Sequence, residues 1–149
     1  MEPLTEAWLY EEMGRQSPDA FVFADREGTI RLWNRGAERL FGYAAGEACG
    51  ESLDLIIPEN LRGRHWEGYH RVMDTGETGY GTRLLSAPAL RKDGTRISVE
   101  FSMAIIRDPA GAVVGSGAVM RDVTERWQRE KALKERLAVL ERGSGKPGC

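Results

Sequence analysis

Residues 91–107, RKDGTRISVEFSMAIIR, carry the clearest structural signal in this sequence. The segment begins with Lys92-Asp93-Gly94, a combination that is typical of a tight hairpin turn because glycine readily takes a positive φ. An alternation of apolar residues follows the turn and predicts a β-strand that buries one face and exposes the other. Its inward-facing positions are Ile97, Val99, Phe101, Met103 and Ile105.

Further strands are predicted on both sides of this segment. A long strand-like run over 78–90 precedes the turn, and another turn leads into a glycine-containing strand over 112–123. Nearer the N-terminus, the turn residues Asp25–Gly28 separate two short strands over 20–25 and 29–34. Five strands that are joined mostly by hairpins predict an antiparallel sheet.

Helices are predicted before, between and after these strands. Residues 4–14 form a short amphipathic pattern, Asn34 can cap a single helical turn that follows it, and an exit helix covers 123–142. A longer helix is predicted over 58–74. Its inward face is expected to comprise Leu61, His65, Tyr69 and Val72, which recur at helical spacing.

The composition excludes several classes of protein. The 149 residues suit a single domain, and an apolar content of 41% suffices for a core. A formal net charge of −2 argues against a dedicated nucleic-acid binder. No apolar run approaches the roughly 20 residues that cross a bilayer, and the acidic N-terminus lacks the basic region of a secretory signal. Cys49 and Cys149 form no paired motif, so a reducing cytoplasm is expected.

Short motifs in a fixed order resemble the PAS sensor fold. They are Asp25–Gly28 with Asn34, Glu38–Tyr43, Gly50, Pro58-Glu59, Arg91–Gly94 and Arg121–Glu125, the last being similar to the Asp-Ile-Thr motif before PAS signalling helices. The resemblance covers about residues 15–126. It implies an α+β, profilin-like fold, with a five-stranded antiparallel sheet, short helices over one face and an internal cavity. The expected divisions are an N-terminal helical cap (1–16), a PAS core (17–122), a coiled-coil-like exit helix (123–142) and a flexible tail (143–149).

Members of this family hold haem, flavin or small metabolites in the cavity, or leave it empty. The segment Arg64–Arg71 resembles the corresponding helix of FixL-type haem oxygen sensors, whose axial histidine matches His65. An imidazole can ligate haem iron through one ring nitrogen. Arg71 matches an arginine that is a candidate partner for a haem propionate, and Tyr69 shares the inward face with His65. The resemblance thus implies a cofactor site with His65 as the metal ligand.

The sequence departs from these sensors at the arginine that hydrogen-bonds bound oxygen. An ungapped count from His65 places Leu85 at that position, and leucine has no donor. Arg83 lies two residues earlier, on the same face of the predicted strand, and could replace the arginine or supply nothing. With Leu85 in the site, dioxygen would lose a polar stabiliser that CO and NO need less.

Other ligands and roles stay open at this point. The adduct chemistry of light-sensing PAS domains needs a cysteine where this chain has Leu53, so that chemistry is not expected, and non-covalent flavin binding stays open. Alternatively, His65 is a half-buried, hydrogen-bonded structural residue of a PAS domain that binds no haem. None of the common motifs for nucleophilic, metal or phosphate chemistry occurs, so catalysis is not expected.

The two terminal helices supply a second functional argument. Leu133, Leu137 and Leu140 have the spacing of a short coiled-coil seam, and the N-terminal helix carries Trp8, Leu9 and Met13. The segment after the PAS core is too short for an output domain, so the chain is expected to act as a homodimer or with a partner in trans.

The leading hypothesis is therefore a cytoplasmic, stand-alone PAS sensory module that binds a small ligand or cofactor, with regulation of transcription as one implied output. Two alternatives are a haem-based gas sensor with His65 as axial ligand and a ligand-free dimerisation module. Direct contact with nucleic acid or a membrane is expected in neither case.

Overall fold

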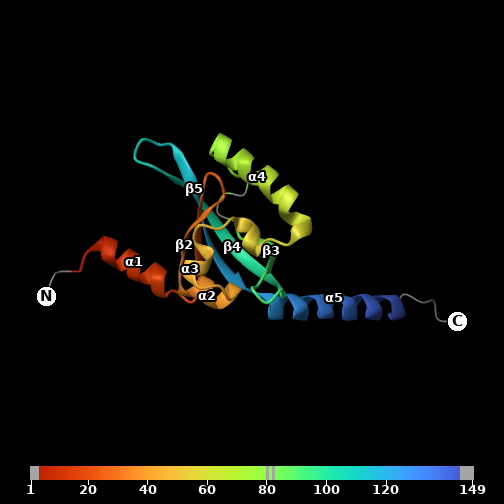
Figure 1. Cartoon of the computed structure of the whole chain (residues 1–149). Helices are drawn as coiled ribbons and strands as arrows, with labels where there is room; N and C mark the ends of the chain where they lie inside the picture. Colours follow the sequence, from red (N-terminus) through yellow and green to blue (C-terminus); the bar gives the residue numbers. More distant parts are fainter. Residues whose placement is uncertain (1–3, 80, 82, 145–149) are drawn as a thin grey trace.

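The computed structural model describes residues 4–79, 81 and 83–144 (Figure 1). One five-stranded sheet is flanked by helices at both ends of the described chain and carries the short helices on one face. The elements are α1 (Glu6–Gln16), β1 (Ala20–Asp25), β2 (Ile30–Trp33), α2 (Arg35–Phe41), α3 (Ala45–Ala48), the 3₁₀ turns η1 (Leu53–Ile56) and η2 (Glu59–Leu61), α4 (Arg62–Thr75), β3 (Leu85–Leu90), β4 (Arg96–Arg107), β5 (Val113–Asp122) and α5 (Thr124–Ser144).

The sheet is antiparallel throughout, with the strand order β2-β1-β5-β4-β3. The pairing of β1 with β5 joins the N-terminal hairpin to the C-terminal three-stranded meander. Residues directly opposite one another share a face, and one such row crosses four strands from Leu85 through Phe101 and Met120 to Ala20. We call this the inner face, because the residues on it pack against the helices.

The strand predictions are confirmed within one or two residues, except for the run over 78–90. β3 covers only Leu85–Leu90 of that run, and the described residues before it (78, 79, 81, 83 and 84) are not in a strand. Gly81 has a φ of +59°, a left-handed conformation that cannot continue a strand, so the regular pairing begins after it. Pro88 is tolerated inside β3 because this strand lies at the edge of the sheet.

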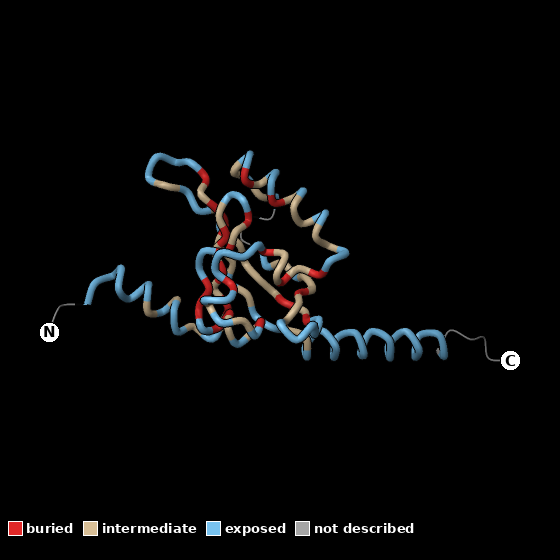
Figure 2. Tube along the Cα trace, viewed as in Figure 1, coloured by how far each residue is buried: buried red, intermediate tan, exposed pale blue. Residues whose placement is uncertain are grey.

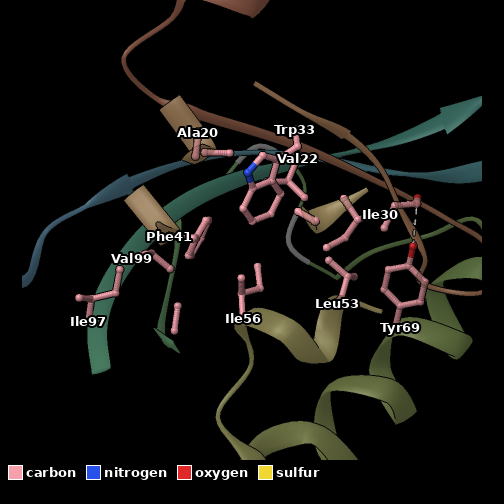
Figure 3. Packing of buried hydrophobic residues seen from close by; sticks show 14 of the residues in the cluster. Ala20, Val22, Ile30, Trp33, Phe41, Leu53, Ile56, Tyr69, Ile97 and Val99 are labelled. Atoms are coloured by element: carbon pink, nitrogen blue, oxygen red, sulfur yellow. Dashed lines mark hydrogen bonds between the residues drawn. The ribbon is translucent and has the colours of Figure 1, made fainter. Parts of the chain in front are cut away.

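The core lies between the inner face and the short helices (Figure 3). Ile30 of β2 and Phe41 of α2 are its largest fully buried side chains. The Trp33 ring lies 5.3 Å from the Phe41 ring, and its Nε1 donates to the Tyr43 carbonyl at 2.9 Å. These contacts fix α2 on the sheet. Trp33 and Phe41 do not line the space between α4 and the sheet.

Asn34 joins the N-terminal helix to the sheet. Its Oδ1 accepts hydrogen bonds from the backbone N–H groups of Phe21 (2.8 Å) and Ala37 (2.9 Å), the second of which caps α2 as predicted. Its Nδ2 donates to the carbonyls of Gly14 (2.6 Å) and Asp19 (3.0 Å). The side chain is 7% exposed, so all four bonds form in a largely dry environment.

Both terminal helices project away from the sheet and are exposed along most of their length (Figures 1 and 2). α1 has no buried residue. α5 begins at Thr124 and runs to Ser144, so the helix includes the first two residues of the predicted flexible tail; residues 145–149 of that tail lie outside the described residues, as do residues 1–3 of the predicted N-terminal cap. Across the described ranges, no helix combines the length and apolar character that a membrane span requires.

Candidate ligand-binding site

A half-open cavity of about 510 Å³ lies between helix α4 and the inner face of the sheet, and we call it the α4 cavity. The helix and the loop after it form one wall, and β3, β4 and β5 form the other. The wall from the helix and loop comprises Arg64, His65, Gly68, Tyr69, Arg71, Val72, Met73, Glu77 and Gly79, and the sheet wall comprises Leu85, Ser86, Phe101, Met103 and Ser116.

The buried face of α4 is rotated slightly from the predicted one. Tyr69 is buried as expected, but the other buried residue of the helix is Met73, and Leu61 lies before the α-helix in the η2 turn. The predicted helix over 58–74 is therefore split into a 3₁₀ turn and an α-helix. His65 and Val72 lie beside the buried stripe, at the cavity.

Trp66 holds the N-terminal half of α4 in place. Its Nε1 donates to Asp54 Oδ1 at 2.7 Å, and its ring lies edge-on to Tyr69 and stacks on His70. The same ring lies directly over Gly28 in the β1–β2 turn, where a Cβ atom would come within 2.1 Å of two ring carbons. Glycine at position 28 thus allows the turn and the helix to approach closely, which sets the position of His65 one residue earlier.

Tyr69 connects the middle of α4 to the end of β1. Its hydroxyl lies 3.2 Å from the Ala24 carbonyl oxygen, a contact drawn in Figure 3, and 2.5 Å from the carbonyl oxygen of Asp25. Burial raises the pKa of the phenol, although a hydrogen bond with the Ser116 hydroxyl acts in the opposite direction. Tyr69 therefore stays protonated as a donor, and its hydroxyl anchors the helix.

His65 is the histidine of the α4 cavity. Its ring contacts Trp66 at 4.7 Å and Tyr69 at 5.6 Å between centroids. Nδ1 is buried and has no hydrogen-bond partner among the described residues. Burial lowers the pKa of His65, nearby His70 lowers it further, and Asp54 partly opposes the shift. At neutral pH the imidazole is thus in the uncharged form that can bind a metal ion.

The other predicted site residues are placed differently. Leu85 lines the sheet wall of the α4 cavity, half-buried and paired with Phe101. Arg71 is exposed at the rim, and its guanidinium makes no ion pair or hydrogen bond to the described residues. Arg83 was expected on the same strand face as Leu85, and this is wrong, because β3 begins only at Leu85. Arg83 is exposed and is not among the residues that line the cavity.

The cavity also contains residues that the site prediction missed. Phe101 and Met103 were predicted only as inward-facing strand residues, and Met73 and Ser116 were not singled out. The strand alternation that includes Phe101 and Met103 is visible in the sequence. The sequence does not indicate that α4 and the sheet are far enough apart here to leave a cavity. Within the described ranges, no cluster of three His, Cys, Asp or Glu side chains could hold a bare metal ion.

The predicted association residues lie on exposed helix surface. Trp8, Leu9 and Met13 of α1 are 47%, 42% and 71% exposed. Leu133, Leu137 and Leu140 of α5 are 64%, 56% and 63% exposed. Residues 125–143 of this helix are exposed on all sides. Both helices therefore present apolar side chains that contact little of their own chain.

Comparison with protein families agrees with this architecture. The family model described as PAS fold matches residues 15–128. The chain belongs to the PAS family. The match includes the sheet, α4 and the first turn of α5. The resemblance inferred from the motifs and the five-stranded antiparallel fold are thus confirmed.

Relatives of this PAS domain include signalling proteins. The chain is 34% identical over 126 residues to Sensor protein FixL of Bradyrhizobium diazoefficiens. The alignment covers 83% of this chain and 24% of FixL. It is 27% identical over 119 residues to Oxygen sensor protein DosP of Escherichia coli, covering 79% of this chain and 15% of DosP. The chain thus spans a quarter or less of the length of these relatives, in which the PAS domain is one part of a larger sensor.

Solved structures agree on the fold. The PAS domain of a protein from Colwellia psychrerythraea superposes with a TM-score of 0.71 at 22% identity, covering 81% of this chain and 99% of that one. An RNA-binding light-oxygen-voltage receptor superposes with a TM-score of 0.72 at 20% identity, covering 98% of this chain and 43% of the other. At these identities the likeness extends to the PAS fold and not to the ligand.

Proposed function

We propose that this PAS domain is a gas-sensing domain that binds haem in the α4 cavity, with His65 as the axial ligand of the iron. The observation that carries the proposal is the state of His65. Its imidazole lines a half-open cavity, burial favours its neutral form, and Nδ1 has no partner among the described residues. A buried nitrogen without a hydrogen bond is costly, and metal ligation gives the imidazole a role that offsets this cost.

The residues around His65 suit a porphyrin. A volume of about 510 Å³ lies in the usual range of cofactor and small-ligand sites, roughly 300–1,000 Å³. Val72, Leu85 and Phe101 supply apolar surface for the macrocycle. Arg71 lies at the rim with a guanidinium available to a carboxylate, as a haem propionate requires. Haem in this cavity would supply an iron atom that binds diatomic gases beside the sheet wall.

The chain's own residues determine which gas is favoured. Dioxygen bound to haem carries partial negative charge and is held better when a donor faces it, whereas CO depends less on such a donor. Leu85 and Phe101 offer none, so the donors on the described sheet wall are the serine hydroxyls at positions 86 and 116. The names of FixL and DosP mark them as sensors, and DosP as an oxygen sensor. For this chain, the absence of a charged donor among the described residues of the sheet wall favours CO or NO over dioxygen.

Absorption spectroscopy tests the proposal. The protein is expressed with a haem precursor, and spectra are recorded as isolated, after dithionite and after CO. We expect a Soret band at about one haem per chain, which shifts with CO and is lost in His65→Ala. His70→Ala is the matched control, because His70 is exposed and stacks on Trp66 from another side of the helix. A band that survives His65→Ala but not His70→Ala would contradict the assignment.

A second candidate function, association without a ligand, is favoured by the terminal helices. The exposed Leu133, Leu137 and Leu140 suit a short interface between two copies of α5. Charged substitutions of these leucines should leave the monomer folded, because the side chains contact little of their own chain. We expect Leu133→Glu with Leu137→Glu to halve the mass in light scattering. Lys134→Glu, between them on another side of α5, should not change it.

A further inference from the structure

We propose that a second cavity binds the phosphate group of a small ligand through Arg39 and Arg91. This open cavity of about 400 Å³ lies at the base of the sheet, where α2 and the turn between β3 and β4 (residues 91–95) meet the end of β5 (Figure 1). We call it the arginine cavity. Its lining residues are Pro18, Asp19, Gly36, Arg39, Leu40, Arg91, Met120, Arg121 and Asp122. None of these residues lines the α4 cavity, so binding here does not depend on haem.

The three arginines of this cavity differ in what contacts their charge. Arg121 donates to Asp19 Oδ2 at 2.9 Å and forms an ion pair with it. Arg39 and Arg91 make no ion pair or hydrogen bond through their guanidinium groups to the described residues. Two positive side chains from distant segments therefore line one cavity without a partner, and an anion that enters it can contact both.

The carboxylates near these arginines are already engaged. Asp19 is paired with Arg121, and Asp122 accepts hydrogen bonds from the N–H (2.8 Å) and the hydroxyl (2.6 Å) of the first residue of α5. Asp93 lies in the same turn as Arg91 and attracts its charge, but the Asp93 carboxylate accepts from a backbone N–H of the turn at 2.9 Å and forms no ion pair with Arg91. The acidic groups in the described part of the chain thus leave the two guanidinium groups available.

The backbone holds both arginines on segments that are fixed to one another. Helix α2 packs closely on the segment before β1, since a Cβ atom added at Gly36 would come within 2.0 Å of the Asp19 carbonyl oxygen. The N–H of Lys92 donates to the Phe41 carbonyl at 2.8 Å, which joins the turn beside Arg91 to the end of α2. Binding of an anion would therefore order only the arginine side chains and not the backbone, which keeps its entropic cost low.

The lining of the cavity favours a phosphate group over a carboxylate. A guanidinium presents paired N–H donors that match the oxygens of either anion. A phosphate ester carries a charge of about −1.5 to −2 at neutral pH, which two guanidinium groups can balance, whereas a carboxylate needs only one. Pro18, Leu40 and Met120 supply apolar surface beside the arginines for the organic part of such a ligand.

Calorimetric titration of the full chain with phenyl phosphate and with inorganic phosphate tests the proposal. The ionic strength is kept constant, because salt screens exposed charges. We expect saturable binding of one phenyl phosphate per chain, weakened about tenfold in Arg39→Gln and in Arg91→Gln, since each variant removes one charged pair. Tighter binding of phenyl phosphate than of inorganic phosphate would identify an organic phosphate as the ligand, and equal binding would identify free phosphate. Benzoate that binds as tightly as phenyl phosphate would overturn the assignment of a phosphate group.

Arg35→Gln and Arg96→Gln are the matched controls. Arg35 lies one helical turn before Arg39 on α2, and Arg96 lies on the other side of the turn from Arg91; both are exposed and neither lines the arginine cavity. None of the four side chains is buried, so all variants should keep the circular dichroism spectrum of the parent protein. Binding that is equally strong in all four variants would reflect a general attraction to positive surface and would overturn the inference, as would the lack of saturable binding. Neither result would alter the Soret band by which haem binding is tested.

Discussion

The replacement Gly28→Ala tests whether the β1–β2 turn sets the position of the cavity helix. Gly28 has a φ of +81°, which costs a non-glycine residue about 1–2 kcal/mol. The added Cβ would also lie 2.1 Å from two carbons of the Trp66 ring, where ordinary contacts are about 3.5–4 Å. Moving a packed ring of this kind costs a further 1–3 kcal/mol or so, and we therefore expect a loss of about 2–5 kcal/mol in unfolding free energy.

The chain offers a matched control for the backbone part of this cost. Gly94 has a φ of +87° and open space around the position of a Cβ atom. Gly94→Ala should therefore cost only the conformational part, about 1–2 kcal/mol. Urea unfolding followed by circular dichroism measures both variants, and the difference between them isolates the contact with Trp66.

A double-mutant cycle provides the decisive comparison. In a Trp66→Ala background the ring is absent, so Gly28→Ala should cost no more than Gly94→Ala. Two outcomes would refute the reasoning: equal costs of Gly28→Ala and Gly94→Ala in the parent protein, or an unchanged cost of Gly28→Ala after the ring is removed. Either would mean that α4 is not held by the β1–β2 turn.

Three further predictions follow from the contacts of single residues. Asn34→Ala removes four hydrogen bonds and should lower the unfolding free energy by about 2–4 kcal/mol in urea titrations; a loss below about 0.5 kcal/mol would contradict the role of Asn34 as a junction. Tyr69→Phe leaves the carbonyls at the end of β1 without their phenolic donor and should cost about 1–2 kcal/mol by the same assay, whereas an unchanged midpoint would exclude that anchor. Burial lowers the pKa of His65 in the folded apoprotein, so the unfolded chain, with a histidine pKa near 6.5, binds the proton more readily. Stability should therefore fall as the pH drops below about 6.5 toward the folded pKa, less steeply in His65→Gln than in His70→Gln, and identical pH profiles would exclude the effect.

Much of the architecture could be predicted because local chemistry and long-range packing agree. The alternation after Gly94 and the turn at Asp25–Gly28 determine strands whose ends the structure moves by only one or two residues. The strand order could not be predicted, since the pairing of β1 with β5 joins segments 90 to 100 residues apart in the chain. The strand predicted over 78–90 is too long because Gly81 takes a left-handed conformation, which the sequence pattern does not reveal.

The cavity was harder to predict for a physical reason. The helical spacing that brings His65 inward is visible in the sequence, and the structure places His65, Tyr69 and Leu85 around one space. Whether inward-facing residues fill a core or line a cavity depends on how far the helix stands from the sheet. That distance is determined by Trp66 over Gly28 and by Tyr69 at the end of β1, which are contacts between distant segments.

Strand β4 connects the cavity to the exit helix. Phe101 faces the cavity, while its neighbour Glu100 faces the other side and forms an ion pair with Arg126 of α5. Two residues earlier, the N–H of Ser98 donates to the Thr124 hydroxyl at 2.8 Å, which holds the first turn of α5. Suppose that β4 can take two arrangements and that a ligand in the cavity binds one of them more tightly. The ligand then favours that arrangement of β4. Because β4 also carries the contacts with α5, the ligand changes how α5 is attached to the sheet. The shift in population cannot exceed the difference in the ligand's affinity for the two arrangements of β4. A ligand that contacts only α4 has no such difference and would leave α5 unaffected.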